Sequence, residues 1–255
     1  MNEISAVSDM ILESRKIVVF TGAGISTESG VSDFRSPGGI WDKFDPSELN
    51  FHSFLASETS REKYWDFYKQ LWPTMVEAEP NRGHYAIAEL YQLGKLDCVI
   101  TQNIDSLHQK SGIPEEKVLK LHGTMEWVVC LECGKKYSRE QIQSRLESGE
   151  KIPRCDACGG ITKPATISFG QAMPEWETRE AQKRAAGCDL FLVAGSSLVV
   201  YPAAQMPLLA RDSGAKLVII NLTPTPHDQY ADIVINEKTG ETLTQIVEQV
   251  KAKLN

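Results

Sequence analysis

Two pairs of cysteines in the middle of the chain have the spacing of metal ligands. Cys130 and Cys133 form one Cys-x-x-Cys motif, Cys155 and Cys158 form a second, and a glycine follows each motif. Two intervening residues allow both thiolates of a motif to reach one ion from a tight turn. Four thiolates with no open position predict one structural Zn²⁺ ion that stabilises a segment too small for a hydrophobic core of its own. An iron–sulfur cluster is less favoured, and a pair of redox-active motifs is less favoured still.

A second group of polar residues follows the short apolar run 17–20. The loop after this run includes Gly22 and Gly24, which lack a Cβ, so the backbone can turn sharply and its amides can approach a phosphate. Ser26 and Thr27 add hydroxyl donors at the same place. A strand that ends in such a loop is typical of a nucleotide site.

The two glycines alone do not decide between a site and a turn, because their spacing differs from the dinucleotide fingerprint of dehydrogenases. No acidic residue follows a second clear strand about 20 positions later, where such an enzyme holds a ribose. For Gly22 and Gly24 by themselves, a plain strand-to-loop turn is an equally good interpretation. The end of the loop, Asp33-Phe34-Arg35, is hard to explain by packing and favours a binding site.

Three more apolar runs, separated by helical patterns, read as strands buried on both faces and end directly in polar residues. The polar segments are Gln102-Asn103-Ile104-Asp105, Gly195-Ser196-Ser197 and Asn221-Leu222-Thr223. Strands that alternate with helices predict an α/β fold with a parallel sheet covered on both faces. Ligands of open parallel sheets bind outside the carboxyl ends of the strands, so these segments and the loop after residue 20 should line one crevice.

One histidine also follows directly on an apolar stretch, as the polar segments above do. His122 ends the apolar stretch 118–121 and precedes a glycine, in line with the expected crevice. An imidazole with a pKa near neutrality can accept a proton from a sugar hydroxyl. The other histidines are interpreted as structural background: His52, His84, His108 and His227.

The remaining patterns are helical. Aromatic residues spread over 36–80 predict short helices that pack over the opening loop, mainly as a satellite hydrophobic cluster. A helical pattern after residue 80 stops at Gly94, and apolar residues between 243 and 254 form the stripe of a docked C-terminal helix. Cys98 and Cys188 lie beside strand-like runs and are interpreted as small buried side chains.

Composition limits the classes of function. The chain has 255 residues, enough for one large domain with a satellite. It carries 27 Lys and Arg against 34 Asp and Glu, a net charge of −7, which argues against direct nucleic-acid binding and permits a basic partner such as a lysine-bearing peptide. No apolar run reaches the roughly 18 residues that a membrane helix requires. The N-terminal segment lacks the pattern of a secretory signal, so a cytoplasmic location is expected, where cysteines stay reduced.

The ordered motifs of this chain resemble the sirtuin family of NAD-dependent protein deacylases. The resemblance is carried by Gly22-Ala23-Gly24-Ile25-Ser26, Asp33-Phe34-Arg35, Thr101-Gln102-Asn103-Ile104-Asp105, Leu121-His122-Gly123, the four cysteines, Phe169-Gly170, Gly195-Ser196-Ser197-Leu198 and Asn221-Leu222. These motifs occur in the family's order and cover nearly the whole chain. The resemblance implies a Rossmann-like NAD-binding domain made of residues 1–35, 81–123 and 164–255. It also implies a smaller domain with a helical module, 36–80, and a zinc-ribbon module, 124–163.

The resemblance further implies a reaction in the cleft between the two domains. The acyl oxygen of an acetyl-lysine protein or peptide would attack the nicotinamide ribose of NAD, giving free lysine, nicotinamide and an O-acyl-ADP-ribose. Asn103 and Asp105 would hold the ribose and the nicotinamide amide, and His122 would deprotonate a ribose hydroxyl. The other residues implied to bind the cofactor are Gly22, Ala23, Gly24, Ser26, Thr27, Asp33, Phe34, Arg35, Gln102, Ile104, Gly195, Ser196, Ser197, Asn221, Leu222, Lys238 and Thr239. The peptide would lie as an added β-strand between segments that include Ile167, Phe169, Gly170, Val199 and Tyr201.

Three departures from the family pattern bear on specificity. Val31-Ser32 stands where the family often has Ile-Pro, which predicts a less rigid cofactor loop. Gln171 stands where Phe-Gly is usually followed by Glu, which removes a charge beside the peptide. Members that remove succinyl or malonyl groups carry Tyr and Arg three positions apart, whereas Tyr68 is followed here by Leu71, so an acetyl or other uncharged acyl group is expected.

Three alternative functions are weighed against deacylation. Mono-ADP-ribosylation would use the same cleavage of NAD with another acceptor, and the mass of the products separates the two reactions. A hydride-transferring oxidoreductase is disfavoured by the missing ribose-binding acid. A non-catalytic zinc-ribbon adaptor for nucleic acid is disfavoured by the negative net charge and by His122.

Overall fold

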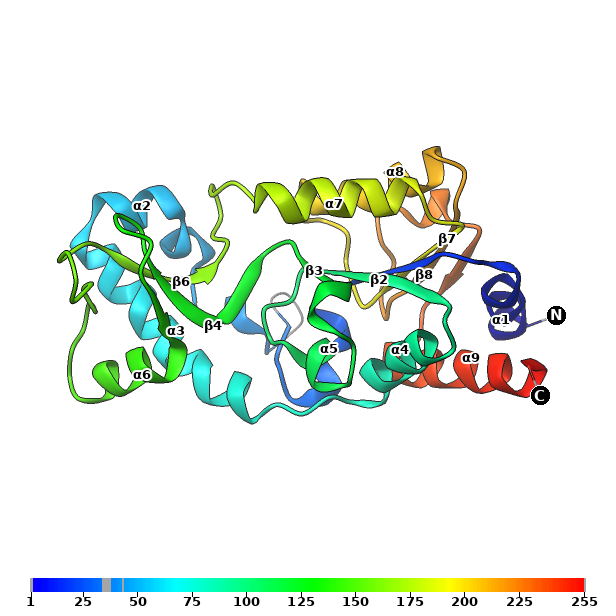
Figure 1. Ribbon diagram of the computed structural model, residues 1–255, viewed down its shortest axis with the longest axis horizontal. Helices are drawn as coiled ribbons and strands as arrows, with labels where there is room; N and C mark the ends of the chain where they lie inside the picture. Colours follow the sequence, from blue (N-terminus) through cyan, green and yellow to red (C-terminus); the bar gives the residue numbers. More distant parts are fainter. Residues whose placement is uncertain (1, 34–37, 43, 255) are drawn as a thin grey trace.

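The computed structural model describes residues 2–33, 38–42 and 44–254, with the backbone alone at residues 41 and 48 (Figure 1). The predicted cofactor residues Phe34 and Arg35 therefore lie outside the described residues. In Figure 1 a parallel sheet with its covering helices occupies the right of the view, and a smaller lobe around α2, α3 and α6 occupies the left. Across the described part of the chain, no helix is both long enough and apolar enough to cross a membrane.

The larger lobe is built on a six-stranded parallel sheet with the order β3-β2-β1-β7-β8-β9. The strands are β1 (Ile17–Thr21), β2 (Leu96–Thr101), β3 (Val118–Lys120), β7 (Leu190–Ala194), β8 (Lys216–Ile220) and β9 (Ile233–Ile235). Thr21 pairs with both Thr101 and Ala194, and Ala194 pairs with Ile220. Four strands therefore end at the same level, and the polar segments that follow them meet at one edge, as the sequence predicts.

Helices cover both faces of this sheet. On one face lie α1 (Glu3–Glu13), α4 (Arg82–Gln92) and α9 (Thr239–Leu254), and on the other lie α7 (Glu175–Ala186) and α8 (Met206–Asp212). Because each face packs against helices, β1 and β7 are buried along their whole length, which explains why their sequences are apolar without alternation. Cys98 and Cys188 belong to the core on the α7 face, as predicted, and burial raises the pKa of each thiol to about 12.

The predicted helix stop after α4 is confirmed. Gly94 has a φ of +69°, a left-handed conformation that glycine adopts without the penalty of a Cβ. The short 3₁₀ helices are η1 (Ala23–Ile25), η2 (Thr27–Ser29), η3 (Ile40–Asp42), η4 (Pro46–Leu49), η5 (Glu115–Lys117), η6 (Ala203–Gln205) and η7 (Asp228–Tyr230). Two of them, η1 and η2, form the loop after β1.

The smaller lobe combines helices with a three-stranded antiparallel sheet of order β5-β4-β6. Its elements are α2 (Phe51–Ala56), α3 (Glu58–Glu77), α6 (Arg139–Glu147), β4 (Gly123–Cys130), β5 (Lys136–Ser138) and β6 (Thr162–Thr166), and α5 (Leu107–Lys110) lies after β2. The prediction of short helices alone is wrong for α3, which has 20 residues and contains Pro73. Aromatic residues at helical spacing along α3 are buried against the lobe, and this tertiary contact holds the helix beyond the proline.

Candidate active site

A cavity of about 900 Å³ opens at the carboxyl edge of the parallel sheet and extends to the smaller lobe. It is lined by the loops after β1, β2, β7 and β8, the start of α9, one face of α3 and the segment 166–171. The predicted site residues that line it are Gly22, Ala23, Gly24, Ser26, Thr27, Asp33, Gln102, Asn103, Ile104, Asp105, His122, Ile167, Phe169, Gly170, Gly195, Ser196, Ser197, Tyr201, Asn221, Leu222, Lys238 and Thr239. Of the predicted residues that the structure describes, Val199 does not line the cavity. The convergence of four strand ends on one crevice is confirmed, and the roles of the individual residues stay predictions.

The two glycines after β1 allow close packing between two loops of the site. The N–H of Gly22 donates to Ala194 O at 3.3 Å, and the N–H of Gly24 donates to Gly195 O at 2.9 Å. A Cβ at either glycine would lie 2.8 Å from Gly195 O. These glycines therefore let the loop after β1 pack directly against the loop after β7. Both amides are bonded within the protein, and cofactor binding by this loop stays a prediction.

The segment after β2 is held in a hydrogen-bonded network. Asp105 is buried, and its two carboxylate oxygens accept hydrogen bonds from the Ser26 hydroxyl at 2.7 Å and from Leu107 N–H at 3.0 Å. Asn103 Nδ2 donates to Ser26 Oγ and to Gly22 O, both at 3.1 Å. Burial raises the pKa of Asp105, and the hydrogen bond from Ser26 opposes this effect. The Ser26 hydroxyl thus orients Asn103 and Asp105.

Two histidines interpreted above as background lie behind this network. His108 Nε2 is 2.9 Å from Thr21 Oγ1, and the Thr21 hydroxyl donates to Thr101 Oγ1 at 2.8 Å. Since that bond uses the only proton of Thr21, His108 Nε2 must be the donor. The rings of His84 and His108 lie 5.1 Å apart, and burial lowers both pKa values, that of His84 to about 4. Both imidazoles are therefore neutral, and that of His108 supports the end of β1.

The position of His108, three residues after Asp105, is the sequence signal that could have revealed its contact with the site. His84 had a weaker signal, since it belongs to the first turn of α4, where its Nδ1 accepts a hydrogen bond from Asn81 N–H at 3.3 Å. Its proximity to Ser26, 3.5 Å between Nε2 and Oγ, arises only when α4 docks under the loop after β1.

His122 lies at the junction of β3 and β4 and lines the cavity. Its Nδ1 is 3.0 Å from Gln102 O. A carbonyl oxygen can only accept, so Nδ1 carries the hydrogen and Nε2 is the acceptor nitrogen. Burial lowers the pKa of His122, and the hydrogen bond to Gln102 partly opposes this shift. The neutral ring with an acceptor at Nε2 is the form that a general base requires.

The segment 166–171 borders the cavity on the side of the smaller lobe. Ile167 N–H donates to His122 O at 2.9 Å, which ties the segment to the candidate base. Phe51 N–H donates to Phe169 O at 2.9 Å, which ties it to the start of α2. The segment is therefore fixed between the two lobes.

A tight turn ends this segment. Gly170 has a φ of +79°, and the Gln171 side chain accepts a hydrogen bond from Ser168 N–H at 3.2 Å. Across the cavity, Tyr201 leaves 59% of its surface exposed, and Phe169 leaves 43% exposed. These aromatic surfaces at the rim can contact a bound chain.

The opposite end of the cavity is polar. Gln102 Nε2 donates to Ser196 Oγ at 2.8 Å, which links the loops after β2 and β7. Asn221 Nδ2 donates to Thr223 O at 2.7 Å, so its side-chain amide is oriented by its own loop. Lys238 and Thr239 reach the cavity from the start of α9.

Helix α3 closes the cavity on the side of the smaller lobe, mainly with apolar side chains. Phe67, Leu71 and Met75 line this wall, and the Tyr68 hydroxyl bonds to Thr166 Oγ1 at 2.8 Å. Among the lining residues that the structure describes, Lys238 is the only lysine or arginine, and it belongs to α9. The wall formed by α3 therefore has no cation for a carboxylate.

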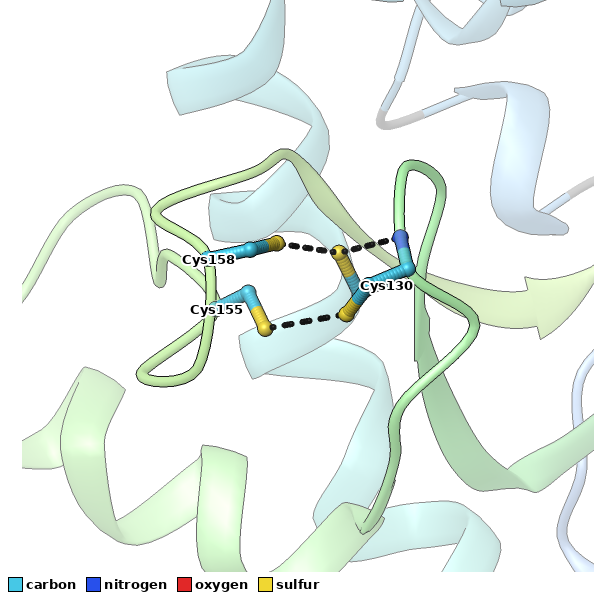
Figure 2. A group of neighbouring side chains, drawn as sticks. Cys130, Cys155 and Cys158 are labelled. Carbon is cyan, nitrogen blue, oxygen red and sulfur yellow. Dashed lines mark hydrogen bonds between the residues drawn. The ribbon is translucent and has the colours of Figure 1, made fainter.

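The four motif cysteines form a separate cluster, part of which Figure 2 shows. The Sγ atoms of Cys130 and Cys158 are 3.5 Å apart, those of Cys133 and Cys155 are 3.6 Å apart, and all four lie within 4.8 Å of one another. Four thiolates bound about 2.3 Å from one Zn²⁺ stand roughly 3.8 Å apart in a regular tetrahedron. The Tyr137 hydroxyl donates to Cys155 Sγ at 3.1 Å and lowers the pKa of that thiol to about 6, which favours the thiolate. The cluster fits a structural zinc ion, as predicted.

Comparisons with known proteins agree with this arrangement. The Sir2 family model matches residues 22–202. NAD-dependent protein deacetylase 1 of Bradyrhizobium diazoefficiens is 48% identical over 244 residues, which cover 96% of this chain and 95% of that protein. A solved complex of a Sir2 variant with a deacetylated p53 peptide and 3'-O-acetyl ADP ribose has a TM-score of 0.91 and 39% identity, covering 97% of this chain and 98% of the other. A Sir2 complex with a p53 peptide and NAD⁺ has a TM-score of 0.90 and 38% identity, covering 99% and 100%. This chain therefore belongs to the Sir2 family, the sirtuins.

Proposed function

We propose that this chain is an NAD-dependent protein-lysine deacetylase, which transfers the acyl group of a modified lysine to ADP-ribose and releases nicotinamide. The observation that carries the proposal is the orientation of His122. Its Nδ1 is held by Gln102 O, which leaves Nε2 as a base in the cavity that also contains Asn103 and Asp105. The names of its relatives, such as the 48% identical NAD-dependent protein deacetylase 1, support the same function.

The residues around the cavity suit NAD. When bound, NAD supplies a bond between nicotinamide and ribose that is broken, and a ribose that receives the acyl group. Asn103 and Asp105, already oriented by Ser26, hold the ribose and the nicotinamide amide. His122 accepts a proton from a ribose hydroxyl. The other predicted cofactor residues, from the loops after β1, β2, β7 and β8 and the start of α9, hold the rest of the dinucleotide.

The protein substrate binds as an extended chain at the rim of the cavity. Ile167, Phe169 and Gly170 form one side of this site, and Val199 and Tyr201 form the other. Support comes from the fixed backbone of segment 166–171 and from the exposed aromatic rings at the rim. Main-chain hydrogen bonds then supply affinity that depends little on the peptide sequence, as in other cases of strand addition.

We propose the domain division that the resemblance implies. Residues 1–35, 81–123 and 164–255 would form the NAD-binding domain, and 36–80 and 124–163 would form the helical and zinc-binding modules of the smaller domain. The two separate sheets support two domains, although β4 (Gly123–Cys130) and β6 (Thr162–Thr166) of the smaller sheet extend beyond the boundaries at 123/124 and 163/164. The protein works in the cytoplasm, a location supported by its six unpaired cysteines, four of which are arranged to bind a metal.

The preferred acyl group is uncharged. The wall formed by α3 presents Phe67, Leu71 and Met75 and offers no cation to a carboxylate. We expect acetyl-lysine peptide to be turned over at least about tenfold faster than the matched succinyl-lysine peptide, because the carboxylate would be buried without a partner. Steady-state rates on two peptides of the same sequence measure this ratio, and faster turnover of the succinyl peptide would contradict it.

The central experiment is incubation of the native chain and of His122→Ala with NAD and an acetyl-lysine peptide. The native chain should form nicotinamide, deacetylated peptide and O-acetyl-ADP-ribose in equal amounts, and His122→Ala should lose at least about a hundredfold in rate. Mass spectrometry distinguishes this outcome from ADP-ribosylation, which would add mass to a protein acceptor. Absence of nicotinamide release by the native chain would refute the proposed function.

A further inference from the structure

Lys163 in β6 is an unusual residue, because its side chain is buried without a carboxylate partner. Only 1% of its surface is exposed. Its Nζ donates to Thr166 O at 2.5 Å and to Pro164 O at 3.4 Å, and the described residues provide no ion pair for it. Lysine is almost never fully buried unless it is paired, since desolvation of an ammonium is costly. This desolvation lowers the pKa of Lys163 to about 7. An apolar residue at this position would avoid the free-energy cost of burying a charge.

The ammonium lies between two aromatic rings of the helical part of the smaller lobe. Nζ is 5.9 Å from the ring centre of Phe51 at the start of α2 and 5.4 Å from that of Tyr64 in α3. Aromatic faces attract a cation at these distances and repay part of its desolvation. One side chain of β6 thus contacts both helices beside which β6 lies (Figure 1).

The same two aromatic residues hold the segment that follows β6. Phe51 N–H donates to Phe169 O at 2.9 Å, and the Tyr64 hydroxyl is 2.9 Å from Ser168 Oγ. Thr166, whose carbonyl accepts the hydrogen bond from Lys163, is the last residue of β6 and the first of this segment. Lys163 therefore fixes the start of the segment and, at the same time, packs against the residues that fix its middle.

We infer that Lys163 is a positioning residue for the substrate peptide, which sets the backbone of segment 166–170 so that an acyl-lysine chain can pair with it. The inference rests on the proposed function. Strand addition requires an edge that is already ordered, because ordering it during binding would reduce the affinity. Lys163 itself, being buried, does not contact the peptide. A side chain that only stabilised the fold would not affect peptide and NAD differently.

The test compares Lys163→Met, which removes the charge and the donor, with Lys163→Arg, which keeps both. Lys69→Met is the matched control, because Lys69 Nζ also joins α3 to the zinc-binding part, at Leu146 O and 3.0 Å, but away from segment 166–170. KM is measured separately for acetyl-lysine peptide and for NAD, and peptide binding without NAD is measured by calorimetry. Zinc content and melting temperature show whether each variant is folded.

For Lys163→Met we expect peptide KM and Kd to rise roughly tenfold, as when a buried hydrogen bond that orders a site is lost, while KM for NAD changes less than about twofold. Lys163→Arg should recover most of the peptide affinity, and Lys69→Met should match the native chain. Equal changes in both KM values, or unchanged peptide binding, would overturn the inference.

If Lys163→Met does not fold, the same measurements on Lys163→Gln, which keeps an N–H donor without the charge, decide the question. Failure of the proposed function is distinguishable, because the native chain itself would then not convert the peptide. If the native chain is active and the peptide KM of a Lys163 variant is unchanged, only this inference is contradicted, and the proposed function stands.

Discussion

At the scale of single residues, the cavity is a site whose polar groups are oriented before any ligand arrives. Asp105 is fixed by Ser26 and Leu107, Asn103 by Ser26, and His122 by Gln102 O. Groups held this way need no reorganisation when charge develops in a transition state, which is the main source of electrostatic catalysis. The order is obtained from the Ser26 hydroxyl and from backbone groups.

The tautomer of His122 leads to a prediction about pH. Burial lowers the pKa of His122 below its ordinary value of 6.5, and only the neutral ring can accept a proton. The neutral fraction falls as the pH falls through this pKa, so deacetylation should keep more than half of its maximal rate at pH 6.5 and reach half-maximal activity only at lower pH. A pH–rate profile of kcat/KM measures this, and half-maximal activity above pH 6.5 would contradict it.

Two groups could account for the loss of activity at low pH, because burial also raises the pKa of Asp105. Protonation of Asp105 would likewise remove activity at low pH. NMR titration of the His122 ring protons identifies the group, since the imidazole resonances shift at the pKa of His122 alone.

Ser26 gives a second prediction at this scale. Ser26→Ala removes the donor to Asp105 Oδ2, which is buried, and the acceptor of Asn103 Nδ2, which is half-buried. We expect a loss of about 1–3 kcal/mol in the free energy of unfolding, and a fall in kcat of roughly tenfold or more because the two side chains lose their orientation. Chemical denaturation and steady-state kinetics measure the two effects.

The control is Ser8→Ala in α1. Ser8 is also fully buried, and its hydroxyl contacts Ile4 O at 2.8 Å and Ile246 O at 3.1 Å, far from the cavity. It should lose stability and keep its kcat. If Ser26→Ala loses only stability, then the hydroxyl does not orient the catalytic groups.

At the scale of elements, the site is a product of strand register. The parallel pairs of Thr21 with Thr101 and Ala194, and of Ala194 with Ile220, bring four loops to one edge. The missing Cβ atoms of Gly22 and Gly24 let two of these loops touch. The antiparallel sheet β5-β4-β6 approaches the same edge through segment 166–171. This sheet is small, and two of the seven fully buried members of its core, Cys130 and Cys155, belong to the cysteine cluster.

Metal removal should therefore unfold this element selectively. A small core that includes its own metal ligands is stable only when the ion is bound. We expect about one zinc per native chain. A chelator should raise amide exchange in residues 124–163 by an order of magnitude or more, leave β1, β2, β7 and β8 protected, and abolish turnover.

Cysteine variants provide the control for metal removal. Cys155→Ala should lose the zinc, whereas Cys188→Ala, which alters a buried thiol in the core on the α7 face, should keep it. Exchange protection that persists in β4 and β6 after the metal is gone would show that the ion is not structural.

At the scale of the whole molecule, the cavity lies between two lobes that are stabilised in different ways. The parallel sheet has a large core on each face, whereas the smaller lobe depends on the aromatic residues of α3 and on the cysteine cluster. The cavity is lined by residues of both lobes, so a ligand that fills it would contact both. Ligand binding should therefore reduce local unfolding in several segments that are distant from one another in the sequence.

Hydrogen exchange in the presence of a non-cleavable NAD analogue tests this view. We expect slower exchange in 21–30, 102–105, 195–197 and 238–240, and, when acetyl-lysine peptide is added, also in 166–171, because bound ligands protect only the segments that they contact or order. Protection should rise at least about threefold at saturating ligand. Helix α6, which does not line the cavity, is the internal reference, and equal protection of α6 would contradict a single shared site.

The sequence by itself determined most of the parallel sheet and the place of the site. Apolar runs that end in polar residues identified five of its strands, β1, β2, β3, β7 and β8, and their functional edge, because burial on both faces requires continuous apolar sequence. The spacing of the cysteines identified the cluster, because ligand geometry is local.

Only the tertiary structure decided which partners the polar residues have. Ser26, His84 and His108 come from three separate segments, so their contacts depend on how α4 and α5 dock beneath β1. The role of Gly22 and Gly24 in packing against Gly195, and the burial of Lys163 between Phe51 and Tyr64, likewise join residues far apart in the chain. Local propensity carries no information about such contacts, since they form only when packing brings complementary surfaces together.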